Sequence, residues 1–395
     1  MTILEELKLK ALEELTGNIL PFWDNIMPDR KHGGFYGRAD GYNNIIPDAP
    51  KGGIMHARIL WTYAAVYNKT GDPFYLKAAS AVADYILDHF FDHQQGGTWW
   101  SLTAKGEPLD RKKMIYSQSY FIYALSECFR ATRKRKYLDG AINLFHLVEK
   151  HGHDKVNGGY TEAFDHEWEA LDDRRLSDKD INEKKSMNTH LHLIEAYANL
   201  FSLWPDESLG RRLTDLVNIF TGRIIDPHSS HLNLFFDESW NVRSDIISYG
   251  HDIEASWLLY EAGRALGDSK LTKSLEPVSL GLLKAALEGL RDDGSLVYEK
   301  NTGKGHTDTD RHWWVQAEAV TGLFNAFMMT GDHKLLGMAQ RCFEYITINL
   351  VDDGKGEWYW SVREDGTVNR EDDKAGFWKC PYHNSRMCLE LISRI

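Results

Sequence analysis

A histidine and a glutamate stand near the start of an apolar segment in the middle of the chain, "SYGHDIEASWLLYEAG". Residues three apart share one face of a helix, so His251 and Glu254 are expected to lie on the same side. Imidazole titrates near neutral pH, and a neighbouring carboxylate can orient its ring and favour the imidazolium. The pair therefore predicts that this helix begins at a binding pocket where protons are moved.

Five other helical segments carry polar or aromatic side chains in their first turns. These are Arg58; Tyr116 and Tyr120; Asn188 and His192; Trp313, Trp314 and Glu318; and His383 and Arg386. One such residue is usually a buried polar group with satisfied hydrogen bonds. Their presence on six segments instead predicts one shared cluster, if the helices begin at the same end of the fold.

An internal repeat supplies that arrangement. Segments rich in glycine and aromatic residues, such as "HGGFYGRADG", "QGGTWWSLTAKGEP" and "NGGYTEAFDHEWE", recur at intervals of about 62 residues. Each is typical of a β-hairpin. Between hairpins there is room for two helices, one apolar nearly all round ("YSQSYFIYALSECFRATR") and one amphipathic ("YLKAASAVADYILDHFF").

The repeat predicts an all-α fold, an (α/α)6 barrel made of six helical hairpins, with short β-hairpins in the connections at one end. We expect a single domain over residues 1–395. The apolar helices form the inner ring and run parallel, so their N-termini meet. The amphipathic helices form the outer ring with a polar stripe facing solvent. The charged insert "LDDRRLSDKDINEKKS" is expected to be a surface loop or lid.

Composition excludes several classes of protein. The net charge of -12 gives no support for a nucleic-acid partner, and no apolar run is long enough for a membrane span. The N-terminal "MTILEELKLKALEEL" lacks the apolar core of a signal peptide, and the four cysteines show no CxxC pair, so a cytoplasmic protein is expected. The aromatic share of 12% fits either core filler or an aromatic-lined cleft for a sugar.

The segments "HARILWTY", "MNTHLHLIEAY", "GHDIEASWLL", "RHWWVQAEA" and "GFWKCPYHNSRMCLE" resemble those of the N-acylglucosamine 2-epimerase family, and within it the cellobiose 2-epimerases. The likeness spans nearly the whole chain. It implies the same (α/α)6 fold, interconversion of sugars epimeric at C2, a small saccharide as the partner, and no metal or organic cofactor. It also implies an isomerase of the disaccharide-active branch, a monomer or a weak homo-oligomer.

The resemblance carries over to individual residues. It implies that the catalytic positions are Arg58, His192, His251, Glu254 and His383. It implies that Asn188, Trp314 and Trp378 contact the sugar, and Tyr116 is expected to position a hydroxyl beside them.

Epimerisation at C2 of an open-chain aldose requires removal of the C2 proton and its return from the opposite face. Two histidines with pKa values near neutrality suit this step, and His251 and His383 lie on the fourth and sixth inner segments, so they can face each other. Glu254 is expected to hydrogen-bond His251. Arg58, with His192, is expected to stabilise the enediolate oxygens.

Other residues of these segments are expected to have structural roles. Trp313 and Tyr120 are expected to pack, Glu318 and Arg386 to pair with a neighbour, and His190 to be structural. His56 and His231 are expected in loops or at the surface, together with His153, His166, His228 and His306.

Several alternatives stay open. Within the family they are a mannose or N-acylglucosamine 2-epimerase and an aldose–ketose isomerase. Outside it, a metal-dependent isomerase would use HxH (His190, His192) and HxxE (His251, Glu254) as ligand fragments. A glycoside hydrolase needs a pair of carboxylates, for which Glu254 and Glu318 are the obvious candidates. A non-catalytic sugar-binding module would have little use for opposed histidines.

Overall fold

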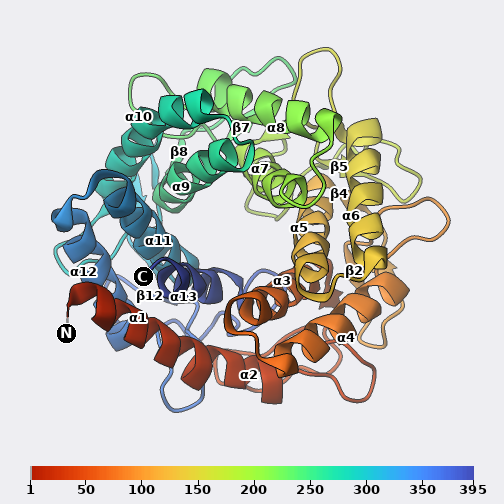
Figure 1. Cartoon of the computed structure of the whole chain (residues 1–395), viewed down its shortest axis with the longest axis horizontal. Coiled ribbons are helices and arrows are strands. Elements are labelled where there is room, and N and C mark those ends of the chain that lie inside the picture. Colours follow the sequence, from red (N-terminus) through yellow and green to blue (C-terminus); the bar gives the residue numbers. More distant parts are fainter. Residues whose placement is uncertain (1) are drawn as a thin grey trace.

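The computed structural model describes residues 2–395 and arranges their helices in two concentric rings (Figure 1). The inner ring consists of α3 (Gly53–Thr70), α5 (Ile115–Thr132), α7 (Met187–Phe201), α9 (Tyr249–Ala265), α11 (Trp313–Thr330) and α13 (Tyr382–Arg394). The outer ring consists of α1 (Ile3–Glu14), α2 (Leu20–Asn25), α4 (Pro73–His89), α6 (Arg135–Leu147), α8 (Glu207–Ile219), α10 (Ser269–Ala286) and α12 (His333–Asn349).

The inner ring closes on itself. Each inner helix packs against the next one along the chain, and α13 packs against α3. The first outer helix, α1, packs against α13, so the two ends of the chain lie close together (Figure 1). The predicted (α/α)6 barrel is confirmed, with the N-terminal helices completing the outer ring beside the last inner helix.

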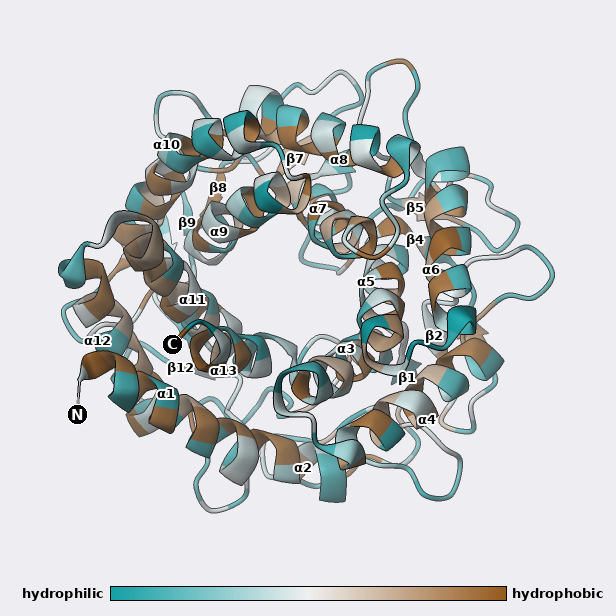
Figure 2. Ribbon diagram, in the orientation of Figure 1, coloured by the Kyte–Doolittle hydropathy of each residue, from teal (hydrophilic) through white to brown (hydrophobic). Residues whose placement is uncertain are grey.

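Burial follows the predicted difference between the two rings. Every residue of α3 from Gly53 to Val66 is buried, whereas α8 buries one face through Leu209, Leu213, Leu216 and Val217. Figure 2 shows the outer helices with hydrophilic and hydrophobic faces. Within residues 2–395, no helix is long and apolar enough to cross a membrane.

The turns from inner to outer helices follow from two residue types. After α3, Gly71 adopts the left-handed region with φ of 72°, and Asp72 then caps α4 by accepting the Phe74 N–H at 2.9 Å. After α11, Gly331 and Asp332 repeat this turn before α12. Glycine takes the left-handed conformation without steric cost, and aspartate satisfies a free N–H of the first helical turn.

Short strands gather at the end where the inner helices begin. They are β1 (Lys51–Gly52), β2 (Ser101–Leu102), β3 (Pro108–Asp110), β4 (Lys113–Met114), β5 (Ala163–Phe164), β6 (Lys185–Ser186), β7 (Phe235–Phe236), β8 (Ile246–Ser248), β9 (Glu299–Asn301), β10 (His306–Asp308), β11 (Arg311–His312) and β12 (Ser361–Val362). All pair antiparallel, and the strand before an inner helix pairs with the hairpin that follows that helix, as Met114 does with Ala163. The charged insert runs without helix or strand from 171 to 184.

One side chain in the first turn of each of five inner helices accepts a backbone N–H from the adjacent hairpin. The pairs, acceptor first, are His56 and Phe35, Gln118 and Thr98, His190 and Tyr160, Asp252 and Leu232, and Gln316 and Leu296. On the sixth inner helix, Asn384 occupies the equivalent position and donates to Glu357. These anchors fix which face of every inner helix points outward.

Two histidines expected in loops or at the surface take part in these anchors. His56 is fully buried, and His231 is 5% exposed, with its Nδ1 2.7 Å from Asp252 Oδ2. The prediction for His56 was wrong: it lies on α3, because a buried backbone N–H requires an acceptor, which a neutral imidazole provides. His231 does lie in a loop, as expected, but that loop is buried against Asp252. The structural role expected for His190 is confirmed.

We expect His190→Gln to keep the fold at pH 7 and to resist acid better than the unmodified protein. Glutamine already serves this purpose at Gln118 and Gln316. Burial lowers the pKa of His190 to about 4 in the folded protein. Between about pH 6.5 and pH 4, His190 is therefore protonated in the unfolded chain and neutral in the folded protein. Stability is therefore lost as pH falls from about 6.5 to about 4, by roughly 3 kcal/mol for this residue alone.

Urea unfolding at pH 7 and pH 5 measures this difference. The substitution should reduce the loss of unfolding free energy between these two pH values by about 2 kcal/mol. His93→Gln, on an exposed turn, is the matched control that should leave the loss unchanged. Equal losses in the unmodified protein and the His190 variant would contradict the assignment.

Candidate active site

The hairpin anchors set the register of every inner helix. The anchoring side chain points outward, so the residues two before, one before and two after it lie on or near the opposite, inward face. The level two residues before the anchors holds Tyr116, Asn188 and Trp314. The level one residue before them holds His251 and His383. The level two residues after them holds Arg58, Tyr120, His192, Glu254, Glu318 and Arg386. Each of the nine predicted site residues except Trp378 occupies one of these three levels.

The outermost level is partly open to solvent. Asn188, Trp314 and Trp378 are all partly exposed, and Asn188 Oδ1 has no hydrogen-bond partner within residues 2–395. Trp378 reaches this level from the segment before α13, and its ring centroid lies 6.1 Å from that of Tyr116. Exposed aromatic faces beside a free amide are suited to binding a sugar.

The two predicted acid/base residues flank one indole ring. The Trp314 centroid lies 4.8 Å from the His251 ring and 5.8 Å from the His383 ring. His251 Nδ1 is 2.8 Å from Ser248 Oγ, and His383 Nδ1 is 2.7 Å from Glu318 Oε1. A carboxylate is only an acceptor, so His383 donates through Nδ1 and keeps its Nε2 lone pair available as a base.

Glu254 does not hydrogen-bond His251, contrary to the expectation from their spacing. Its Oε1 instead accepts a hydrogen bond of 2.6 Å from Arg386 Nη2. Both carboxylate and guanidinium are buried, at 1% exposure, and a buried carboxylate is stabilised far more by a cation than by a neutral ring.

The Arg386 guanidinium is the centre of a buried charged cluster. Its Nη2 also donates to Glu318 Oε1 at 2.6 Å, and its Nη1 donates to Glu195 and to the Tyr382 hydroxyl. Glu318 further accepts from Trp257 Nε1 at 3.1 Å. The pairing expected for Glu318 and Arg386 is confirmed, and it includes two more glutamates.

Glu195 is a site residue that the sequence interpretation missed. Its Oε2 lies 3.0 Å from His192 Nδ1, and its Oε1 bonds Arg386 and Tyr382. The missed signal is the spacing of His192 and Glu195, which is the same three-residue step as that of His251 and Glu254. The segment "HLHLIEAY" reads as apolar around it.

Burial and charge together set the protonation of the cluster. Burial, reinforced by the nearby Glu318 carboxylate, raises the pKa of Glu254 to about 8. Burial also acts on Glu195, but the Arg386 charge outweighs it and lowers the pKa of Glu195 to about 2. Three glutamates share the one Arg386 guanidinium, so a proton on one of them reduces the excess of negative charge.

The pKa values of the two predicted acid/base histidines are lowered, which favours their neutral forms. Burial lowers the pKa of His251 to about 3, and burial together with the Arg58 and Arg386 charges lowers that of His383 well below its usual range. The expectation of two histidines with pKa values near neutrality was therefore wrong. The proton of the cluster resides among its glutamates.

Arg58 faces the cluster from α3. Its Nη2 donates to the hydroxyls of Tyr116 at 3.0 Å and Tyr120 at 2.6 Å, and its Nη1 donates to the Trp378 carbonyl at 3.0 Å. The Tyr120 hydroxyl also meets His192, 3.0 Å from its Nδ1. The prediction that Tyr120 only packs was therefore wrong, because its hydroxyl joins two site residues.

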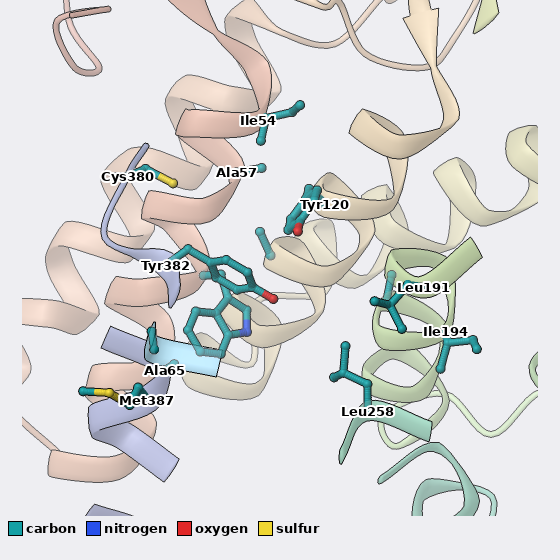
Figure 3. Close-up of a cluster of buried hydrophobic side chains, with 14 of the residues drawn as sticks. Ile54, Ala57, Ala65, Tyr120, Leu191, Ile194, Leu258, Cys380, Tyr382 and Met387 are labelled. Atoms are coloured by element: carbon teal, nitrogen blue, oxygen red, sulfur yellow. The ribbon is translucent and has the colours of Figure 1, made fainter. Parts of the chain in front are cut away.

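The interior around the cluster combines aromatic and aliphatic walls. Figure 3 shows Tyr120 and Tyr382 on one side of the barrel interior, and Leu191 and Leu258 on the other. Trp313 packs against Trp360 with centroids 4.5 Å apart, which confirms its predicted packing role. Polar atoms of the cluster are thereby held in surroundings of low polarity, where hydrogen bonds and charges act strongly.

Glu254, Glu318 and His383 also offer three potential metal-ligand atoms within 4.8 Å of one another. Arg386 Nη2 bonds one oxygen of each carboxylate. His190, the other half of the HxH fragment, anchors a hairpin and faces away from this group. The HxH interpretation is therefore wrong for this pair of histidines.

Comparisons with known proteins agree with the geometry. The family model described as N-acylglucosamine 2-epimerase (GlcNAc 2-epimerase) matches residues 34–386. The chain is 51% identical to a cellobiose 2-epimerase of Bacteroides fragilis, over 98% of this chain and 99% of the relative. It is 37% identical to one of Dictyoglomus turgidum, over 99% and 100%. The solved cellobiose 2-epimerase of Bacillus thermoamylovorans superimposes with a TM-score of 0.94 at 38% identity, covering 99% of this chain and 100% of that chain.

We expect Arg386→Leu to destabilise the protein strongly, by about 3–5 kcal/mol, because it leaves three buried glutamates without their shared cation. Arg394→Leu on the same helix is the matched control. Arg394 is 20% exposed in its side chain and pairs with Glu390 and Glu261, so about 1 kcal/mol or less should be lost. Urea unfolding at pH 7 measures both, and similar losses would refute the assigned role of the cluster.

Proposed function

Because the chain belongs to the N-acylglucosamine 2-epimerase family, we propose that it is a carbohydrate epimerase, an isomerase that interconverts cellobiose and 4-O-glucosyl-mannose at C2 of the reducing sugar. Related β-1,4-linked disaccharides are substrates of the same class. The cellobiose 2-epimerases reported above support the substrate, and the site supports the chemistry.

The observation that carries the proposal is the pair of histidines around Trp314. His251 and His383 occupy the same register position on α9 and α13, one residue before the anchor, and both lie within 6 Å of the indole centroid. A sugar held against this ring has an imidazole on either side. One histidine removes the C2 proton from the open-chain aldose, and the other returns a proton to the opposite face.

The electrons of the broken C2–H bond move onto the C1 carbonyl and form an enediolate. Arg58 and His192 act on its oxygens, because their N–H groups are already fixed by Tyr116, Tyr120 and Glu195. Neutral histidines are suited to accept the proton. Negative charge developing beside them favours their protonated form, and the proton shared by the glutamates replenishes the donor.

A disaccharide substrate is consistent with the exposed level of the site. Trp314 and Trp378 come from different inner-ring segments and present two aromatic surfaces, and Tyr116, 6.1 Å from Trp378 between ring centroids, and Asn188 supply hydrogen-bonding groups at the same level. In this proposal the tryptophans stack on the sugar rings and limit access of water to the enediolate.

The glycoside hydrolase alternative is disfavoured by the position of the carboxylates. Glu195, Glu254 and Glu318 all bond the one Arg386 guanidinium and are nearly fully buried. Hydrolysis needs two carboxyl groups flanking the glycosidic bond, one on each side of the substrate.

The cytoplasmic location that we propose is supported by four unpaired, buried cysteines.

Proton NMR of cellobiose incubated in D2O with EDTA-treated enzyme tests the function. We expect 4-O-glucosyl-mannose with deuterium at C2. Free glucose would identify a hydrolase instead, and activity that returns only after metal is restored would identify a metal-dependent isomerase. Turnover of mannose or N-acetylglucosamine but not cellobiose would place the enzyme in another branch of the family.

We expect His251→Ala and His383→Ala each to lower kcat by about 10²- to 10⁴-fold, the usual contribution of a general acid or base. Trp378→Ala should mainly raise KM, because it removes a binding surface and no proton-transfer group. Circular dichroism confirms that each variant is folded. Near-normal turnover in either histidine variant would rule out the two-base scheme.

The proton on the glutamates predicts an alkaline limit. The cluster holds this proton below the raised pKa of Glu254, which is about 8, and loses it as the pH rises through that value. We expect kcat to fall with a midpoint near pH 8. The melting temperature should instead fall gradually from about pH 4.5, the ordinary pKa of a glutamate, and level off above about pH 8, because the folded protein holds a proton that the unfolded chain has already lost. A kcat that is flat to pH 10 would contradict the proposed source of the donor proton.

A further inference from the structure

Glu162 is a buried carboxyl group that the proposed reaction does not use. Its backbone carbonyl accepts the N–H of Ile115, the first residue of α5. Trp100, Leu234 and Trp360 accept the corresponding N–H of α3, α7 and α11. None of these three side chains is ionisable, so the repeat places a carboxyl group at a position that elsewhere holds an apolar residue.

The Glu162 side chain joins two neighbouring inner helices. Its Oε1 accepts the Tyr116 N–H of α5 at 3.0 Å, and its Oε2 hydrogen-bonds the Thr189 hydroxyl of α7. Thr189 directly follows Asn188 in the chain. Both contacts lie in first helical turns, where N–H groups are free and negative or acceptor groups are favoured.

No cation compensates this buried group within residues 2–395. Glu162 is 3% exposed and forms no ion pair there, and the Asp180 carboxylate acts on it as a like charge. Burial, with the Asp180 carboxylate, raises the pKa of Glu162 to about 8, so the side chain is neutral at pH 7. The side chain accepts the Tyr116 N–H through Oε1 and the Thr189 hydroxyl through Oε2.

Glu162 would be dispensable if another side chain capped the start of α5. The N-cap residue of α5 is Met114, which makes no side-chain hydrogen bond to the helix. The beginning of α5 is therefore held by a residue of the following hairpin. Tyr116, in this first turn, contacts two residues of the site. Its hydroxyl accepts a hydrogen bond of 3.0 Å from Arg58, and its ring centroid lies 6.1 Å from that of Trp378.

We propose that Glu162 is a positioning residue for the sugar-binding side of the site, fixing the distance between Tyr116 on α5 and Asn188 on α7. The inference rests on the proposed function. Tyr116 and Asn188 bind hydroxyls that do not react, so they hold substrate and transition state alike, and Arg58 keeps its shorter hydrogen bond, 2.6 Å to the Tyr120 hydroxyl, when Tyr116 is displaced. Misplacing them raises KM and leaves kcat nearly unchanged.

Three variants of the full chain test this with cellobiose as substrate. Glu162→Leu installs the residue found at the equivalent Leu234 and removes both hydrogen bonds; we expect KM to rise by about 10- to 100-fold, with kcat changed by less than about threefold. Glu162→Gln keeps the acceptor for Tyr116 and can retain a hydrogen bond to the Thr189 oxygen with its amide N–H as donor, so its KM should stay near the original value. Thr189→Val removes one of the two bonds and should raise KM to an intermediate value.

Asp206→Ala is the matched control. Asp206 caps the outer helix α8 by accepting the Ser208 N–H at 2.8 Å, away from the site. Its loss should lower the melting temperature and leave KM unchanged, which is what a merely structural Glu162 would also do.

Each outcome either supports or overturns the positioning role of Glu162. An unchanged KM in Glu162→Leu, or a KM in Glu162→Gln as high as in Glu162→Leu, overturns the positioning role. If Glu162→Leu does not fold, Thr189→Val decides alone: a raised KM supports the role and an unchanged KM overturns it. An unmodified enzyme that exchanges no C2 deuterium with cellobiose overturns the proposed function before any variant is compared.

Discussion

The active end of the barrel depends on one buried guanidinium. Arg386 on α13 bonds Glu195 of α7, Glu254 of α9 and Glu318 of α11, and so ties four of the inner helices together through side chains. Three glutamates in such surroundings would otherwise repel one another and lose hydration without compensation. Because the cation is central and fixed, the glutamates can be buried at 6% exposure or less and still act on their neighbours. Glu318 orients His383, and Glu195 orients His192.

The same burial decides how the histidines work. An imidazole in water is half protonated near pH 6.5. Inside the barrel, the cost of burying charge and the nearby Arg58 and Arg386 keep His383 neutral, with Nδ1 engaged by Glu318. In the proposed mechanism the two histidines exchange the proton with the sugar, and the glutamates of the same cluster resupply it.

Much of this arrangement can be predicted from the sequence. The repeat of about 62 residues gives the two rings, because an inner helix must be apolar all round and an outer one on a single face. First-turn polar residues then predict which side chains converge. The partners within the cluster cannot be predicted the same way. Spacing along one helix suggested a bond between His251 and Glu254, but the partner of Glu254 is Arg386, which lies across the barrel on α13 and brings a compensating positive charge.

Glu195 shows where the limit of sequence reasoning lies. It follows His192 at the same three-residue step as Glu254 follows His251, yet the surrounding Leu, Ile, Ala and Tyr make it look like an isolated charge in a core helix. Only the register fixed by the hairpin anchors shows that His192 faces inward while His190 faces outward.

The anchors also explain how a repetitive scaffold produces an asymmetric site. The same three levels recur on each of the six inner helices. Each level therefore offers six nearly equivalent backbone positions, which differ only in the residue that occupies them. Two of the six places beside the anchors hold histidine, at His251 and His383; the others hold Met55, Ser117, Thr189 and Val315. The two histidines are separated by one intervening helix, α11, whose Trp314 faces both. Neighbouring helices would place two bases on the same side of a sugar, whereas helices two apart place them on either side of the ring that holds it. The choice of positions, on a framework that offers all six, is what makes the site suited to moving a proton across one carbon atom.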